Sequence, residues 1–260
     1  MAVEDRLALL VSDTDRARHV AEEVVRPLHN WVDLEDADIA VVLGGDGFML
    51  QSLHAMLDSG RIVPAYGVNL GTVGFLMNRN RGLDKLIGRI RRAKPHAIVP
   101  LAMEAICTDG RSHKFRAINE VSLLRETRQT AKIEVVVDDK VRIKELVCDG
   151  VLLSTPAGST AYNLSADGPI LPLDSRLLAL TPISAFRPRR WKGAVLPDRS
   201  QVTFRVMEAG KRPVSAVADQ REIRNVAEVR LEMARADELT LLFDPGHALD
   251  ERIVAEQFVV

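Results

Sequence analysis

The sequence predicts an α/β domain with a layered parallel sheet, followed by a β-rich domain. Over residues 1–97, apolar strand-like runs alternate with helical patterns, which is typical of parallel β-α units. From about residue 98 the apolar side chains recur at every second position, the period of a half-buried strand. We therefore expect a boundary near Pro95, with one domain over residues 1–97 and a second over residues 98–244.

The composition is that of an ordinary folded protein. The 260 residues are 47% hydrophobic and 27% charged, which disfavours disorder, and their net charge of −1 lacks the basic excess typical of nucleic-acid binders. No uncharged apolar run reaches the roughly 18–20 residues of a membrane span, and no secretory signal opens the chain. Two cysteines are typical of a reducing cytosol. We expect a cytoplasmic protein with neither nucleic acid nor membrane as a partner.

In the first domain, continuous apolar runs predict buried strands and 3.6-residue periodicity predicts helices. The strands are expected at Leu7–Val11, residues 39–43 and residues 62–68. The helices are expected over residues 15–27, 48–57 and 83–90.

In the second domain, apolar runs between Gly, Pro, Asn and Asp predict further strands. These are residues 133–137, residues 141–143, Val202–Val206, residues 214–217, Val226–Met233 and Leu239–Phe243. Asp138-Asp139 lies between the first two and predicts a hairpin turn. We expect one helix to interrupt these strands around residues 175–180.

The first candidate site is Gly44-Gly45-Asp46-Gly47, between a predicted strand and a predicted helix. Glycines allow close approach of the backbone to a ligand, and the N-terminus of a helix favours phosphate. Asp46 would repel phosphate, so it fits better as a base or metal ligand beside the phosphates. The loop matches neither common nucleotide-binding motif. A tight turn with a capping aspartate explains these four residues about equally well.

Two shorter motifs offer groups that recognise a nucleotide. A second glycine-bearing loop, residues 67–76, contains Asn69, which can hydrogen-bond, and Phe75, which can stack on a base. Asn119-Glu120 offers an amide for an adenine edge and a carboxylate for ribose hydroxyls. Taken alone, Phe75 is better explained as a core residue and Asn119-Glu120 as an exposed pair at a strand end.

The fourth motif is the longest, running over residues 149–165 from Asp149-Gly150 through Ser154-Thr155 and Ser159-Thr160 to Ser165. An apolar strand leads into a cluster of hydroxyl groups and small residues, which suits a sugar-phosphate ligand. By composition alone, a polar loop in a β-rich domain is equally compatible.

The four motifs, in this order and at these intervals, resemble the NAD kinase family, particularly its bacterial members. The resemblance runs from Ile39 to about Asp219, and residues 149–165 are its most specific part, because Gly-Gly-Asp-Gly also occurs in lipid kinases and phosphofructokinases. It implies a Rossmann-like N-terminal domain, a sandwich-like C-terminal domain and a C-terminal tail, about residues 245–260, that returns to the first domain. It also implies phosphoryl transfer to NAD, giving NADP.

By this resemblance Asp46 activates the 2′-hydroxyl of the adenosine ribose, and Gly45 and Gly47 lie at the phosphates. The aromatic ring beside the adenine corresponds to Phe75. Val73 stands where many relatives have Leu, and Phe48 stands where they often have Thr. The change at Phe48 concerns details of the phosphoryl-donor side of the site.

By the same resemblance, Asn119 and Glu120 correspond to the pair of residues that holds the adenine and the ribose. Asp149, Thr160, Ala161, Tyr162 and Ser165 correspond to positions that line the dinucleotide site, with Asp149 towards the nicotinamide half. Asp219 corresponds to an acidic position of a later strand near that site.

The resemblance further implies ATP or polyphosphate as phosphoryl donor, a divalent metal, Mg²⁺, held through the donor phosphates, and a homotetramer or homodimer. A lipid kinase, a non-catalytic NADP-binding regulator and an NADP-dependent dehydrogenase are the alternatives. Residues 149–165 disfavour the lipid kinase, and the presence of Asp46 disfavours the non-catalytic regulator. The missing dinucleotide-binding motif disfavours the dehydrogenase. The basic cluster Arg187, Arg189, Arg190 and Lys192 could meet substrate phosphates or an acidic neighbouring subunit, but a solvated face explains it better.

Overall fold

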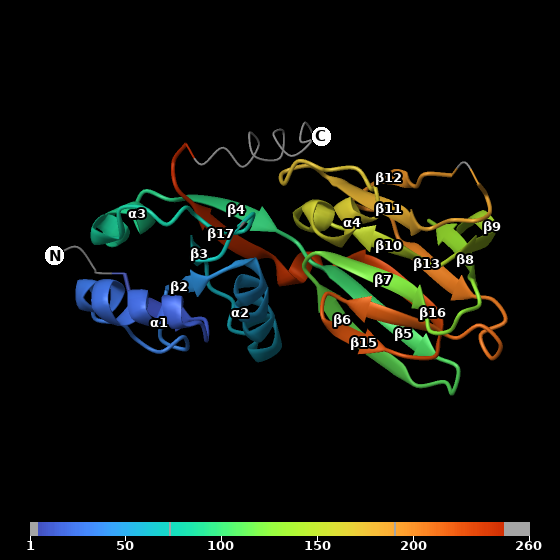
Figure 1. Ribbon diagram of the computed structural model, residues 1–260, viewed down its shortest axis with the longest axis horizontal. Helices are drawn as coiled ribbons and strands as arrows, with labels where there is room; N and C mark the ends of the chain where they lie inside the picture. Colours follow the sequence, from blue (N-terminus) through green and yellow to red (C-terminus); the bar gives the residue numbers. More distant parts are fainter. Residues whose placement is uncertain (1–4, 73, 190, 247–260) are drawn as a thin grey trace. The chain divides into compact units, whose positions relative to one another are not determined.

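Residues 5–246, except 73 and 190, are described by the computed structural model. This part of the chain forms two compact units, one of residues 5–98 with 237–246 and one of residues 99–236 (Figure 1). Residues 247–260 of the tail expected to return to the first domain lie outside the described residues.

The first unit contains a five-stranded sheet in the order β1-β2-β3-β17-β4. Its strands are β1 (Leu7–Val11), β2 (Ile39–Gly44), β3 (Ala65–Asn69), β17 (Leu239–Phe243) and β4 (Lys94–Ile98). The pairs β1-β2, β2-β3 and β3-β17 are parallel, and β4 runs antiparallel to β17. The parallel β-α units predicted from alternating apolar runs are therefore confirmed.

Helices cover both faces of this sheet. The helical segments are α1 (Asp15–Val20), η1 (Ala21–Val25), η2 (Arg26–Leu28), α2 (Asp46–Ser59), η3 (Leu83–Lys85) and α3 (Leu86–Ile90). Ala17 of α1 and Leu86 of α3 share a core with Leu43 of β2. A Cβ at Gly67 of β3 would meet the Met49 side chain of α2, so α2 covers the opposite face. No helix in the described part of either unit is long and apolar enough to span a membrane.

A buried polar network joins the end of β17 to other elements of the first unit. The carboxylate of Asp244 accepts hydrogen bonds from Tyr66 Oη at 2.7 Å and Arg89 Nη2 at 2.6 Å. The amide of Asn78 accepts from Asp244 N at 2.8 Å and donates to Leu242 O at 2.9 Å. Leu239–Phe243 is thus a strand, as predicted, but it belongs to the first sheet and not to the β-rich domain.

The second unit is a sandwich of two antiparallel sheets around one apolar core. One sheet contains β12 (Ala194–Pro197), β11 (Leu177–Ile183), β10 (Gly150–Ser154), β7 (Glu120–Arg125), β14 (Val214–Ala218) and β15 (Arg221–Ile223), in that order. The other contains β6 (Ser112–Ala117), β5 (Leu101–Cys107), β16 (Val226–Met233), β13 (Val202–Val206), β8 (Ala131–Val137) and β9 (Lys140–Cys148). Short helical segments are η4 (Ala157–Thr160), α4 (Tyr162–Ser165) and η5 (Arg235–Asp237).

Two local predictions in the second unit have opposite outcomes. The hairpin β8-β9 is confirmed, and Asp138 and Asp139 have φ of 51° and 60°, the left-handed pair that a two-residue hairpin turn requires. The helix expected at residues 175–180 is wrong, because β11 occupies most of that segment and pairs with β10 and β12. Leu178–Leu180 are buried within the sheet, and such a fully buried run has no period that distinguishes strand from helix.

Candidate active site

The glycine-aspartate loop joins β2 to α2 in the first unit. Gly45 is the N-cap of α2 and Asp46 is its first residue, so the loop lies at the positive end of a 14-residue helix. A Cβ on Gly71 of the second loop would lie 3.6 Å from Gly45 Cα. The two glycine-bearing loops therefore touch through their backbones.

The Asp46 carboxylate holds the second loop. Oδ2 accepts a hydrogen bond from Phe75 N at 2.8 Å, and Oδ1 accepts one from Leu76 N at 3.0 Å. These bonds join three of the predicted features, the loop, the aspartate and Phe75. Gly45, not Asp46, is the N-cap of α2, so the helix-capping alternative that the sequence left open for Asp46 is wrong; the two bonds to the second loop orient its carboxylate instead. A carboxylate has about four acceptor positions, so orientation by two N–H groups is compatible with accepting a further proton donor.

In the second unit, the turn that contains Asn119 and Glu120 is bound by the carboxylate of Asp219. Its oxygens accept hydrogen bonds from Ile118 N at 2.7 Å, Asn119 N at 3.0 Å and Glu120 N at 3.2 Å. Asp219 itself has φ of 51° and its own N–H donates to Glu120 O. Sequence reasoning placed Asp219 near the site but missed this role, because the turn and Asp219 are about 100 residues apart.

Residues 154–158 contact the same turn through its carbonyl groups. Thr155 N donates to Asn119 O at 2.9 Å, and Thr155 Oγ1 donates to Ile118 O at 2.7 Å. A Cβ on Gly158 would lie only 2.2 Å from Asn119 O. A residue with a side chain therefore cannot replace Gly158 unless the backbone moves. Thr155 and Gly158 were not predicted as site residues individually.

The Glu120 side chain is nine-tenths buried beside the other predicted residues. Burial and, secondarily, the charge of Asp219 raise the pKa of this carboxyl to about 8, while a hydrogen bond from the backbone of Tyr162 opposes the rise. Its Oε2 atom is buried and has no hydrogen-bond partner in the described part of the chain. Such an oxygen is placed to exchange a hydrogen bond with a ligand hydroxyl.

Glu120→Gln should flatten the dependence of stability on pH. A carboxyl whose pKa rises on folding contributes stability below its unfolded pKa, near 4.5, and that contribution is lost as pH rises through about 8. We expect the free energy of unfolding of the wild type to fall relative to the variant by at least about 1.4 kcal/mol, one pKa unit, between pH 5 and pH 9. Urea unfolding at both pH values measures this difference. The exposed Glu35→Gln is the control, and equal slopes for wild type and Glu120→Gln would contradict the assignment.

Tyr162 lies within electrostatic reach of both Glu120 and Asp149. The charges of Glu120 and Asp149, together with burial as the largest cause, raise the pKa of the Tyr162 phenol. Arg125 Nε donates to Asp149 Oδ1 at 2.6 Å, which fixes the Asp149 carboxylate at the end of β7. Of the predicted residues, Asn119, Glu120 and Tyr162 are therefore brought together at the start of β7, whereas Asp149 lies at the other end of that strand.

The other predicted site residues within positions 149–165 lie on the short helical segments η4 and α4 or between them. Thr160 ends η4, Ala161 joins it to α4, and Ser165 is exposed at the end of α4. The buried Asn163, which sequence reasoning did not select, holds this segment. Its amide donates to Ser159 O and Pro169 O, and its Oδ1 accepts from Thr181 Oγ1 at 2.7 Å.

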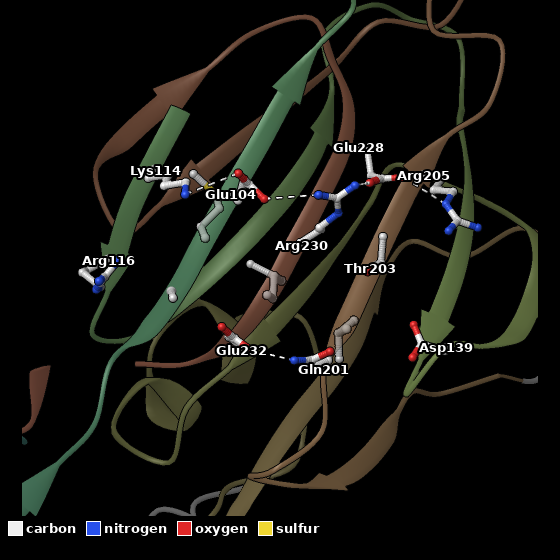
Figure 2. A pocket seen from close by; sticks show the side chains of 14 residues that line it. Glu104, Lys114, Arg116, Asp139, Gln201, Thr203, Arg205, Glu228, Arg230 and Glu232 are labelled. Carbon is white, nitrogen blue, oxygen red and sulfur yellow. Dashed lines mark hydrogen bonds and ion pairs between the residues drawn. The ribbon is translucent and has the colours of Figure 1, made fainter. Parts of the chain in front are cut away.

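A hollow of about 570 Å³ on the outer face of the sheet β6-β5-β16-β13-β8-β9 is a different feature (Figure 2). Several of its charged side chains pair with one another, Arg230 with Glu104 at 3.3 Å and Arg205 with Glu228 at 3.0 Å, and its lining has as many basic as acidic side chains. None of the predicted site residues lines it. Because its charges are mutually compensated, we assign it no part in the site.

Known proteins resemble this chain along its whole length. Residues 118–242 match the ATP-NAD kinase C-terminal domain family. The NAD kinase of Rhizorhabdus wittichii is 60% identical over 257 residues, 99% of each chain, and the NAD kinase of Zymomonas mobilis is 57% identical over 254 residues, 98% of each chain.

Two solved structures share the fold at low sequence identity. Yeast NADH kinase complexed with NADH has a TM-score of 0.82 at 19% identity, covering 98% of this chain and 88% of that one. An NAD kinase from Archaeoglobus fulgidus in complex with ATP has a TM-score of 0.76 at 22% identity, covering 96% and 98%. The full-length identity to curated relatives, carried by a chain that also holds the four motifs, shows that this protein belongs to the NAD kinase family.

Proposed function

We propose that this protein is an NAD kinase, which transfers a phosphoryl group from ATP to the 2′-hydroxyl of the adenosine ribose of NAD. The observation that carries the proposal is the 60% identity to a relative named NAD kinase over 99% of both chains. The products are NADP and ADP, so the chain is a phosphotransferase with an alcohol group as acceptor.

Asp46 is the proposed base. As the ribose 2′-oxygen attacks the γ-phosphorus of ATP, the bond from that phosphorus to the β-γ bridging oxygen breaks, and the hydroxyl proton passes to the Asp46 carboxylate. The hydrogen bonds from Phe75 N and Leu76 N support this role, because they hold the carboxylate in one orientation. Gly45 and Gly47, at the start of α2, are the proposed contacts of the donor phosphates. Phosphoryl transfer depends mainly on such positioning.

The second unit is the proposed binding site for NAD. Asn119 and Glu120 would hold adenine and ribose, and the buried, unpartnered Oε2 of Glu120 supports this assignment. Phe75 of the first unit would stack beside the adenine. Asp149, Thr160, Ala161, Tyr162 and Ser165 would line the rest of the dinucleotide, with Asp149 towards the nicotinamide half.

Mg²⁺ is proposed to enter with the nucleotide, as part of the MgATP substrate. In residues 5–246, with 73 and 190 set aside, no group of three or more His, Cys, Asp or Glu side chains is arranged to hold a metal ion. Coordination by donor phosphates and water suits Mg²⁺, which keeps several waters when bound to proteins. Polyphosphate is an alternative donor that would bring Mg²⁺ in the same way.

We also propose that the protein forms a homodimer or homotetramer, and light scattering measures this oligomeric state.

NADP formation tests this function. The protein is incubated with NAD, Mg²⁺ and either ATP or polyphosphate, and NADP is read with an NADP-specific dehydrogenase. We expect product with ATP. Absence of product with both donors would overturn the proposal and would favour an NADP-binding protein without activity, whereas phosphorylation of dispersed lipid in the same preparation would favour a lipid kinase.

A further inference from the structure

The second unit contains a pocket of about 560 Å³ at one edge of the sandwich. Its walls come from β8, β9, β11 and β12 and from the segment that precedes β12. None of the residues proposed to bind NAD or phosphate lines it. Its volume is within the range of pockets that bind small molecules.

The interior of the pocket is apolar. Val135, Val137 and Leu180 form its buried floor, and they belong to the core of the sandwich. Ile143, Trp191 and Leu196 are half-buried and are packed against that core. Because these side chains line an opening, an apolar ligand that covers them would remove their surface from water.

The rim of the pocket is cationic. Arg142 and Arg199 line it and are exposed, and no ion pair is formed by either guanidinium within the described part of the chain. The one lining carboxylate, Asp138, already accepts hydrogen bonds from Gln201 N at 3.0 Å and Ser200 Oγ at 3.3 Å. The lining therefore carries two guanidinium charges against one carboxylate, an excess of one positive charge that an anion can meet.

The basic cluster seen in the sequence adjoins this pocket without forming its cationic rim. Arg187 and Arg189 lie over the ring of Phe186, at 5.5 and 5.3 Å from its centroid. Pro188 and Trp191 line the pocket instead. The described members of the cluster, Arg187, Arg189 and Lys192, are exposed, as expected for a solvated face, while Trp191 of the same segment supplies an aromatic wall to the pocket.

We propose that this pocket binds a small amphipathic anion, a carboxylate attached to an apolar chain. The apolar chain would cover Ile143, Trp191 and Leu196, and the carboxylate would pair with Arg142 and Arg199. Guanidinium groups bind carboxylates through paired hydrogen bonds, whereas a neutral head group would leave the excess positive charge of the lining without a partner.

Decanoate is the probe, and Trp191 is the reporter. The chain has two tryptophans, so Trp31→Phe in the first unit leaves Trp191 as the single emitter. In that background we expect decanoate, below its micelle concentration, to change the emission saturably. Arg142→Gln with Arg199→Gln should weaken binding at least about tenfold, because two charge-assisted contacts are lost. NADP formation by this double variant should equal that of its parent, so the result is independent of the proposed function.

Matched controls test the role of the two arginines and the role of the apolar chain separately. Arg128→Gln with Arg176→Gln removes the same charge from exposed positions outside the pocket and should leave decanoate binding unchanged. Acetate, which lacks the chain, and decyl maltoside, which lacks the charge, should each bind at least about tenfold more weakly than decanoate. No saturable change with decanoate, or equal binding of decyl maltoside, or equal loss in both double variants, would overturn the proposal.

Discussion

Asp46→Asn should lower kcat for NADP formation by about 10²–10⁴-fold, the usual contribution of a positioned general base. The amide cannot take the hydroxyl proton as the carboxylate can. KM for ATP should change much less, because the glycines of the loop are retained. Steady-state kinetics with NAD and MgATP measure the effect.

The structure adds a second consequence of this substitution. Asparagine has nearly the same shape as aspartate, but both oxygens of the Asp46 carboxylate accept backbone N–H groups. An amide can accept only one of these bonds and turns an NH₂ donor towards the other. The melting temperature and the NAD dissociation constant of the variant must therefore be measured beside kcat. Wild-type kcat in a folded Asp46→Asn protein would contradict the role of Asp46 as base.

Gly158→Ala should raise KM for NAD at least about tenfold and destabilise the fold by ~1–3 kcal/mol, the usual cost of overpacking. The added Cβ would lie 2.2 Å from Asn119 O and 2.5 Å from Asn119 Cα, so the turn that presents Asn119 and Glu120 must move. Because the contact is with backbone, no side-chain rotation relieves it. Kinetics and urea unfolding measure the two effects.

The matched control is Gly210→Ala, where the added Cβ meets nothing within 4 Å. It should leave both KM and stability close to wild type. If Gly158→Ala behaved like this control, the close approach between Gly158 and Asn119 would have no role in NAD binding.

The fold of the first unit could be predicted because its strands and helices are local patterns. Apolar runs and helical spacing gave β1, β2 and α2 within a few residues. The position of β17 could not be predicted in this way, because its membership of the first sheet depends on pairing with β3 and β4, more than 140 residues earlier. Periodicity also failed at β11, whose central residues are buried on both faces.

The candidate site was predictable where its residues form contiguous motifs, and unpredictable where contacts cross the chain. Asp46 and Glu120 stand within recognisable segments. The carboxylate of Asp219 binds the turn at Asn119, and Gly158 packs against that turn because it has no side chain; both contacts join residues that are distant in the sequence. The spacing of residues in the sequence does not predict such contacts, although a glycine among hydroxyl residues is compatible with close backbone approach.

The most direct test of the central claim is identification of the product formed from NAD and MgATP. Mass spectrometry should show one added phosphate, and an NADP-specific dehydrogenase should reduce all of it, which places the phosphate on the 2′-oxygen of the adenosine ribose. A product that the dehydrogenase rejects, with its phosphate elsewhere, or the absence of any phosphorylated dinucleotide with ATP and with polyphosphate, would contradict the assignment of this chain as an NAD kinase.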